Sequence, residues 1–379
     1  MISNWYLIFA GALVEAFIVS LMLTGLMRWV SHRWAFVDHP GERKIHEHAV
    51  PVLGGVAIYL TFNLVILGNL LLLEWAGQLG FSWVQDHVSG YLNATTWRPL
   101  LGVVAGGFII FVLGVVDDLR ALSPEKKLVG QIVAASVLVL SGIRLDVFIE
   151  PLLLQLPVVG GFDTETLSMI GVVVSSGLTM FWVIMMINSM NFLDNMDGLA
   201  GGVAAIAALS FFICILPHEE YFICAMLMVF TGSVCGFLFH NFSPAKIFMG
   251  DSGSMFCGYI LATVAVLGTF YTESISSRAA IVAPLLALSV PIFDTLSVVY
   301  IRWRNGESIM KGDKRHFSHR LVELGMTPRQ AVEFIFLVAA INGLGGALLL
   351  RVNVIGTAVI LAQIVGIFLL IVLLMNAKR

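Results

Sequence analysis

The sequence contains few charged residues. Only 12% of its 379 residues are charged, whereas 59% are hydrophobic, and the mean hydropathy is +0.94. A soluble globular protein has about 25% charged residues. This shortage of charge excludes a soluble enzyme, a disordered chain and a nucleic-acid-binding protein. The four cysteines all lie within apolar runs, so the sequence predicts neither a disulfide framework nor a cysteine-based metal site.

Long hydrophobic runs take up most of the chain. A helix needs about 20 predominantly apolar residues to cross the hydrocarbon core of a bilayer. We therefore predict an all-α polytopic integral membrane protein that forms a single domain over residues 1–379. Its eleven expected transmembrane helices lie at about 5–30, 52–75, 99–116, 128–143, 166–190, 198–216, 221–240, 255–272, 280–301, 330–350 and 353–375.

The basic residues are divided unequally between the two sets of alternating loops. Seventeen of the 21 Lys and Arg residues lie in or beside one set. Because cytoplasmic loops are enriched in Lys and Arg, we place this set and the C-terminus in the cytoplasm and the N-terminus outside. The predicted cytoplasmic loops are about 31–51, 117–127, 188–197, 241–254 and 302–329.

Two adjacent carboxylates, Asp117 and Asp118, end the third apolar run on the predicted cytoplasmic side. Neighbouring carboxylates repel each other, and a divalent cation or local cationic groups would relieve that repulsion. Lys127 follows just before the next run and can bind phosphate as a point charge. The alternative interpretation of the pair is a hydrated stop at the end of a helix.

A second polar motif contains Asn188, Asn191, Asp194 and Asp197. These residues recur every three positions and therefore lie along one helical face. A stripe of amides and carboxylates indicates a site for a hydroxyl-rich ligand that carries a cation. An ordinary helix cap at Asp197 is the alternative, but it accounts for one of the four residues.

A third motif surrounds Asp251, which lies between two glycines just before the eighth apolar run. Glycine permits close backbone approach, and the free N–H groups at a helix start attract anions. Phe248 lies three residues earlier and offers a flat face for a base. Taken alone, the motif is also compatible with a loop that needs its turn residues.

The long basic loop contains a fourth group of candidates, Arg302, His316 and His319. Its cations match phosphate groups. The two histidines lack the glutamate of a zincin signature, and no cysteine lies near them, so zinc is not expected. A loop that is merely positive on the cytoplasmic side would explain the basic residues but not the histidines.

Together and in this order, these segments resemble the polyprenyl-phosphate N-acetylhexosamine-1-phosphate transferases. The resemblance runs from about residue 37 to 321 and rests on the Asp pair, the N-x-x-D-x-x-DGLA stretch and the M-G-D-x-G-S loop. The sequence is most similar to the bacterial undecaprenyl-phosphate N-acetylglucosamine-1-phosphate transferases, which have eleven spans. Those enzymes commonly carry His-x-His-His in the basic loop, whereas this chain has Ser318 before His319.

The resemblance implies transfer of GlcNAc-1-phosphate from UDP-GlcNAc to undecaprenyl phosphate in the bacterial inner membrane, the first membrane step of cell-surface polysaccharide synthesis. It implies Mg²⁺ as the cofactor, with Mn²⁺ as an alternative. Another UDP-N-acetylhexosamine, a covalent aspartyl intermediate and a homodimer remain open. The implied catalytic residues are Asp117, Asp118, Asp194 and Asp197; the implied Mg²⁺ ligands are Asp251 and Asn191; and the implied substrate contacts are Lys127, Asn188, Asn191, Phe248, Arg302, His316 and His319.

The competing class is a transporter for a cation or for a lipid-linked sugar. Transporters place ionisable residues near the middle of the bilayer and often consist of repeated halves. Here most carboxylates lie at one face, which favours the enzyme. Asp294 lies about 10 Å inside the ninth predicted span by helical rise, and the sequence does not indicate its partner.

Overall fold

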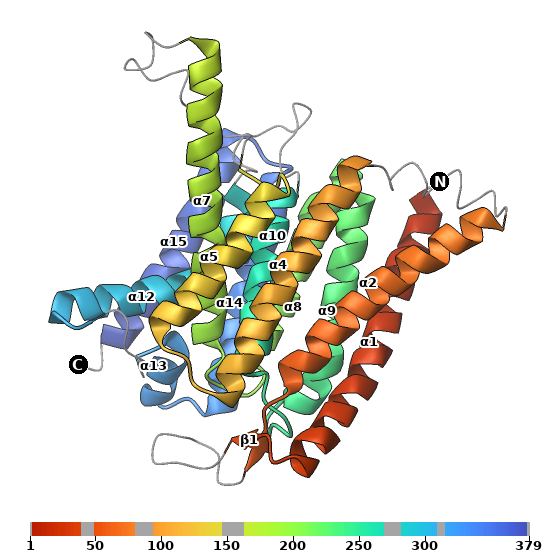
Figure 1. The fold of residues 1–379 in the computed structure, drawn as a ribbon. Coiled ribbons are helices and arrows are strands. Elements are labelled where there is room, and N and C mark those ends of the chain that lie inside the picture. The colour runs from red at the N-terminus through yellow and green to blue at the C-terminus, as the bar shows by residue number, and fades with distance from the viewer. Residues whose placement is uncertain are drawn as a thin grey trace.

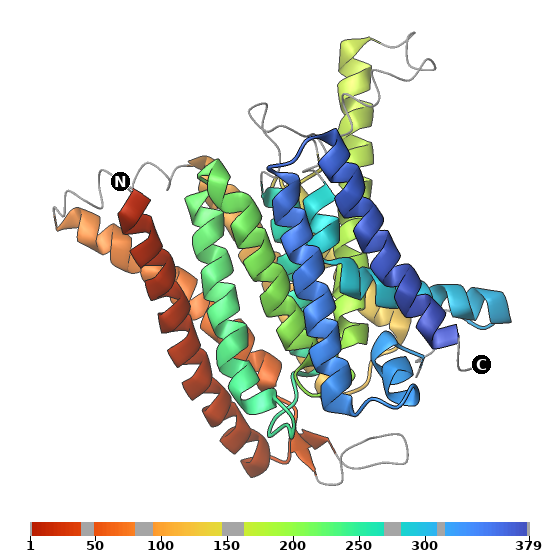
Figure 2. The same cartoon turned by 180° about the vertical axis from the view of Figure 1, so that it is seen from behind.

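The computed structural model describes residues 2–38, 49–79, 94–145, 163–268, 282–308 and 315–376, and these ranges are almost entirely helical. Most of the long helices run side by side in one bundle (Figures 1 and 2). Parts 39–48 and 309–314 of the predicted loops lie outside the described residues. The helices are α1 (Ile2–Arg33), α2 (Gly54–Gln78), α4 (Ala94–Leu119), α5 (Pro124–Leu140), α7 (Thr164–Leu193), α8 (Leu199–Ile215), α9 (Tyr221–Asn241), α10 (Gly250–Leu267), α11 (Ala283–Ala287), α12 (Ser289–Asn305), α13 (Phe317–Glu323), α14 (Pro328–Leu349) and α15 (Val354–Asn376), with a 3₁₀ turn at Leu216–His218.

Two short strands accompany the helices. β1 (Val37–Asp38) and β2 (Val50–Pro51) pair antiparallel, with Val37 opposite Pro51. They lie at one end of the bundle, which we call the hairpin end (Figure 1). The all-α prediction did not include them, because a strand of two residues is too short to show the alternating pattern by which strands are recognised.

Nine helices in the described ranges are long and apolar enough to cross a membrane. The chain is therefore an all-α polytopic membrane protein, apart from the small hairpin. Two of the eleven predicted crossings coincide with shorter elements. One is α5, which has 17 residues, and the other is the run 280–301. The count of eleven crossings stays a prediction.

The predicted ninth span is divided into two helices. α11 ends at Ala287 and α12 begins at Ser289, and α12 lies across the direction of the bundle in both views (Figures 1 and 2). Pro291 lies in the first turn of α12. Because proline has no N–H, it cannot continue the α-helical hydrogen bonds from α11. The polar end of α12 is thereby turned away from the axis of the bundle.

The core of the bundle consists of α8, α9 and α10, in which most residues are buried. α1 packs along α9, where Gly232 and Gly236 face the backbone of α1. A Cβ atom at either glycine would clash with a carbonyl oxygen of that helix. Small residues at such a contact let two membrane helices approach closely, so that van der Waals packing holds them together.

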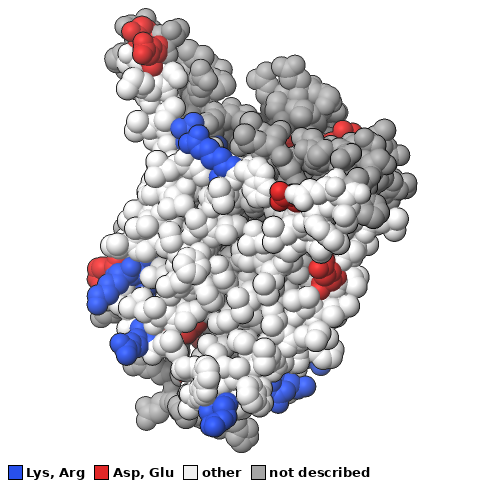
Figure 3. Space-filling view, turned by 45° about the vertical axis from the view of Figure 1, so that its right-hand side comes forward, with Lys and Arg blue, Asp and Glu red and all other residues white. Residues whose placement is uncertain are grey.

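Few charged side chains are exposed on the face of the molecule shown in Figure 3. On the face shown in Figure 3, Lys and Arg gather mainly toward the hairpin end, and the central band carries few charges. A band of this kind matches the hydrocarbon region of a bilayer, in which charged side chains are costly.

The glycines of α2 provide a test of this packing. A Cβ atom at Gly55 would overlap backbone atoms of Gly253 in α10, whereas Gly68 has open space around it. We expect Gly55→Ala to lower the free energy of unfolding by about 1–3 kcal/mol, the usual cost of overpacking. The matched change Gly68→Ala should be neutral or stabilising, because alanine favours a helix by roughly 0.5–1 kcal/mol over glycine. Thermal unfolding in detergent measures both variants, and equal melting temperatures would contradict the contact.

Candidate active site

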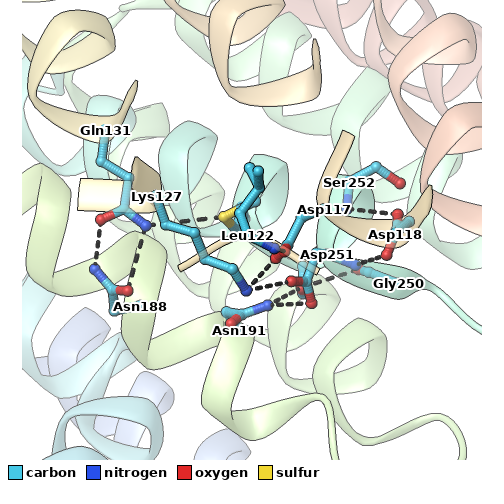
Figure 4. A network of polar contacts seen from close by, with 12 residues as sticks. Asp117, Asp118, Leu122, Lys127, Gln131, Asn188, Asn191, Gly250, Asp251 and Ser252 are labelled. Atoms are coloured by element: carbon cyan, nitrogen blue, oxygen red, sulfur yellow. Dashed lines mark hydrogen bonds and ion pairs between the residues drawn. The ribbon is translucent and has the colours of Figure 1, made fainter. Parts of the chain in front are cut away.

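The start of α10 is held by the carboxylate of Asp118 from the last turn of α4. The backbone N–H of Asp251 donates to Asp118 Oδ1 at 2.7 Å, and the N–H of Ser252 donates to Oδ2 at 3.1 Å (Figure 4). Gly250 has a φ of +71°, and a Cβ atom there would lie 2.7 Å from Asp118 Oδ1. A carboxylate at a helix N-terminus is stabilised by the unpaired N–H groups and by the helix dipole. Asp118 therefore fixes the position of Asp251.

The start of α2 secures the segment that precedes α10. The N–H groups of Gly54 and Gly55 donate to the carbonyl oxygens of Phe248 at 3.0 Å and Met249 at 2.8 Å. In return, the N–H of Phe248 donates to the carbonyl oxygen of Pro51 at 2.7 Å. These three backbone hydrogen bonds join the segment to the start of α2 and to β2 at the hairpin end.

Four side chains meet beside this helix start, and we call them the carboxylate cluster: Asp117, Lys127, Asn191 and Asp251. The ammonium of Lys127 forms an ion pair with Asp117 and lies 2.7 Å from Asp251 Oδ2 (Figure 4). Asn191 donates from Nδ2 to Asp251 Oδ1 at 2.8 Å and to Ser254 Oγ at 3.0 Å. The cluster therefore joins residues of α4, α5, α7 and α10, and it holds a positive charge between two carboxylates.

Asn188 lies one helical turn before Asn191 in α7 and pairs with Gln131 of α5. Its Nδ2 donates to Gln131 Oε1 at 2.8 Å, and Gln131 Nε2 donates back to its Oδ1 at 3.3 Å (Figure 4). Nδ2 also donates to the Ile184 carbonyl oxygen at 2.8 Å. This amide pair joins α5 to α7, and contact of Asn188 with substrate stays a prediction.

Asp194 and Asp197 occupy the turn between α7 and α8. Asp194 ends α7. Its burial, together with the carboxylates of Asp251, Asp118 and Asp197, raises the pKa of Asp194 to about 8. Asp197 Oδ2 accepts a hydrogen bond from the Ala245 N–H at 2.9 Å. Asp197 therefore holds the loop that leads to Asp251, and its catalytic role stays a prediction.

The two predicted histidines lie at the start of α13. His316 is buried, and its Nδ1 lies 2.8 Å from Asp294 Oδ2. Its ring centroid lies 6.0 Å from that of Phe192 near the end of α7. His319 is half-buried within α13. The structure thus brings His316 to the α7 side of the site and supplies the partner of Asp294 that the sequence did not indicate.

Two other predicted substrate contacts are Phe248 and Arg302. Phe248 is half-buried in the segment joined to α2. Arg302 is buried in the last turns of α12 and donates to the Ser308 carbonyl oxygen at 3.3 Å. The substrate contacts of both residues stay predictions.

Comparison with known proteins identifies the family. The model of glycosyl transferase family 4 matches residues 100–269. Over 341 residues, 89% of this chain and 85% of the relative, the sequence is 32% identical to a probable undecaprenyl-phosphate N-acetylglucosaminyl 1-phosphate transferase of Bacillus subtilis. The chain belongs to the polyprenyl-phosphate N-acetylhexosamine-1-phosphate transferase family. It is also 34% identical to a decaprenyl-phosphate N-acetylglucosaminephosphotransferase of Mycolicibacterium smegmatis, with 88% of this chain and 80% of the relative covered.

A more distant relative comes from Escherichia coli. Its undecaprenyl-phosphate alpha-N-acetylglucosaminyl 1-phosphate transferase is 24% identical over 340 residues, which cover 87% of this chain and 80% of the relative. The region matched by the family model includes Asp117, Asp118, Asn191 and Asp251. The carboxylate cluster is therefore contained in the matched region.

The resemblance implies Mg²⁺, and the donor atoms of this member of the family fit that ion. Mg²⁺ prefers oxygen ligands and is usually held by one or two carboxylates together with substrate phosphates. Asp117 and Asp251 both face the Lys127 ammonium, so this position already attracts a positive charge. In the described ranges, no group of three or more His, Cys, Asp or Glu side chains is arranged to hold a metal ion. The carboxylate of Asp251 supplies the kind of oxygen donor that this ion prefers. Asn191 turns its amide nitrogen toward Asp251, and its role as a ligand stays a prediction.

Three organising residues of the transferase were missed in the sequence. Gln131 follows Lys127 by one helical turn on the same face of α5, and this spacing could have revealed it. Asn241 accepts from the Gly198 N–H at 3.0 Å and donates to the Ile247 carbonyl oxygen at 2.8 Å. Ser318 donates to Asn195 Oδ1 at 2.6 Å. The contacts of Asn241 with Gly198 and of Ser318 with Asn195 join segments that are distant in sequence, and no local pattern signals them.

The assignment of Asp118 to the start of α10 can be tested by removing its carboxylate. Asp118→Ala leaves two half-buried N–H groups without an acceptor, and loss of a capping side chain costs about 0.5–2 kcal/mol. We expect the upper part of this range. Asp163 accepts one N–H bond at the exposed start of α7, so Asp163→Ala is the matched control with a smaller expected loss. Thermal unfolding compares them, and a smaller loss for Asp118→Ala would contradict the assignment.

Proposed function

We propose that this enzyme transfers GlcNAc-1-phosphate from UDP-GlcNAc to undecaprenyl phosphate and releases UMP. The names of the relatives support the sugar phosphate and the polyprenyl phosphate. The observation that carries the proposal is the Lys127 ammonium between two carboxylates at the end of an apolar bundle. One substrate is a soluble anion and the other is a long lipid, so the reaction needs a charged site where an apolar surface ends.

The proposed reaction exchanges one phosphorus–oxygen bond for another. An oxygen of the lipid phosphate bonds to the β-phosphorus of UDP-GlcNAc. The bond from that phosphorus to the bridging oxygen breaks, and this oxygen leaves with UMP. The second pKa of a phosphomonoester is near 6, so the lipid phosphate is largely dianionic at neutral pH and needs no strong base. We therefore favour a single displacement over a covalent aspartyl intermediate.

The residues of the carboxylate cluster receive separate roles in this reaction. Lys127 binds phosphate and neutralises its charge. Asp117 orients the phosphate indirectly, through its ion pair with Lys127. Asp251 would hold Mg²⁺, which when bound supplies positive charge that stabilises the phosphate oxygens. Both oxygens of Asp118 accept backbone N–H groups, so we assign this residue to positioning Asp251. Phosphoryl transfer depends mainly on such positioning and charge neutralisation.

The enzyme assay uses purified protein, radiolabelled UDP-GlcNAc and undecaprenyl phosphate. We expect release of UMP that requires the lipid, stops with EDTA and returns with Mg²⁺. Asp251→Asn should reduce the rate by about 10²–10³-fold, because it removes charge from the position that binds the cation. Asp163→Asn, at the other end of α7, is the matched control and should retain activity. Lipid-independent UMP release, or transport of the sugar nucleotide without transfer, would contradict the proposal.

The same assay tests the sugar. UDP-GalNAc, UDP-QuiNAc and UDP-MurNAc-pentapeptide replace UDP-GlcNAc in parallel reactions, and we expect UDP-GlcNAc to give the highest kcat/KM.

We place the hairpin end in the cytoplasm of a bacterial inner membrane, with eleven crossings, because most Lys and Arg residues lie in loops on that side. A cysteine introduced at each of two exposed positions tests this orientation in intact cells: Lys126, in the first turn of α5, and Arg351, between α14 and α15. We expect a membrane-impermeant maleimide to label Arg351→Cys, and to label Lys126→Cys only after permeabilisation. The opposite pattern would reverse the orientation.

A further inference from the structure

Asp294 is a fully buried carboxylate in α12 that has no role in the reaction described above. A charged group is expensive to bury unless hydrogen bonds compensate for its lost hydration. Its two oxygens face the start of α13: the Phe317 N–H donates to Oδ1 at 2.5 Å, and Nδ1 of His316 lies 2.8 Å from Oδ2. Asp294 therefore fixes both the backbone and the ring at this point.

A second buried contact fixes the same segment from the other side. Ser318, which is 1% exposed, donates from Oγ to Asn195 Oδ1 at 2.6 Å in the turn that follows α7. The His316 ring lies against Phe192, the residue that follows Asn191 of the carboxylate cluster. His316 is thus held between α12 and the end of α7, the helix that also carries Asn191.

The pairing also decides which ring nitrogen carries the hydrogen. A carboxylate that accepts on both oxygens requires a hydrogen on Nδ1, which leaves Nε2 as the acceptor of a neutral ring. Within the described part of the chain, Nε2 of His316 has no hydrogen-bond partner. Carboxylates that fix the tautomer of a functional histidine in this way are a recurring arrangement.

We propose that Asp294 is a positioning residue that sets the tautomer and orientation of His316, so that Nε2 faces the sugar nucleotide. This inference rests on the proposed function and assigns a specific atom to the substrate side. The alternative is that Asp294 only ties α12 to α13.

Asp294→Asn separates the two explanations. The asparagine oxygen can still accept the Phe317 N–H, and its amide nitrogen can donate to Nδ1 of His316. Both contacts to α13 are then kept, but the hydrogen of a neutral ring moves to Nε2, so the acceptor is lost. A purely structural role predicts an active variant, whereas a positioning role predicts a folded variant of low activity.

The experiment is a double-mutant cycle on the purified enzyme with Asp294→Asn, His316→Asn and the double variant. Asparagine at 316 keeps a donor near the position of Nδ1 and removes Nε2. We expect Asp294→Asn to lower kcat/KM for UDP-GlcNAc by about 10–100-fold, the usual effect of losing such a supporting group. Because both changes act through one atom, the double variant should be no less active than His316→Asn alone.

The control lies on the same helix. Ser289→Ala removes the hydrogen bond that Asn342 donates to Ser289 at 2.9 Å in the buried contact between α12 and α14. It should retain activity, and melting temperatures in detergent should show that all variants are folded.

Wild-type activity of Asp294→Asn, or losses that multiply in the double variant, would overturn the inference while leaving the proposed function intact. A wild-type protein without lipid-dependent transfer would overturn the proposed function and this inference with it.

Discussion

The capture of the α10 helix start by Asp118 is the interaction on which the site depends. Four elements reach this point: α4 supplies the carboxylate, α10 supplies the N–H groups, and α2 and the hairpin hold the preceding segment. A helix start offers unpaired donors that attract anions, and a built-in carboxylate satisfies some of them. Because Asp118 accepts the N–H groups at the start of α10, the side chain of Asp251 contacts Lys127 and Asn191 instead of those N–H groups.

Charge balance explains why the cluster can exist at the end of an apolar bundle. Several carboxylates that lie close together in space would repel one another and would be costly to bury. Lys127 places one positive charge between two of them, and burial together with neighbouring carboxylates raises the pKa of Asp194 to about 8. The two carboxylates and one ammonium leave the cluster with a net negative charge, which a bound cation can neutralise.

The helices were largely predictable, because a chain that crosses hydrocarbon must satisfy its backbone internally and can do so only with long apolar helices. The sequence predicted which residues belong to the site, but it did not predict which contacts each of them makes. Asp117 and Asp118 are neighbours, and adjacent side chains on a helix point about 100° apart, so the packing of α10 decides which one caps it. The break before α12 depends on where Pro291 falls relative to α11. Likewise, the partner of Asp294 lies 22 residues away on another helix, beyond the reach of any periodic pattern.

The backbone bonds from α2 bear on how much of the chain forms a working unit. The stretch that defines the family, residues 100–269, contains both the Asp pair and the loop with Asp251. The N–H groups that hold that loop belong to Gly54 and Gly55, and they lie outside the stretch. A fragment or chimera cut at the boundaries of the family match would therefore carry every acidic side chain of the cluster. It would lack the N–H groups of Gly54 and Gly55, which hold the segment before Asp251. A piece that keeps this arrangement must extend beyond the motif-bearing region to include Pro51, Gly54 and Gly55.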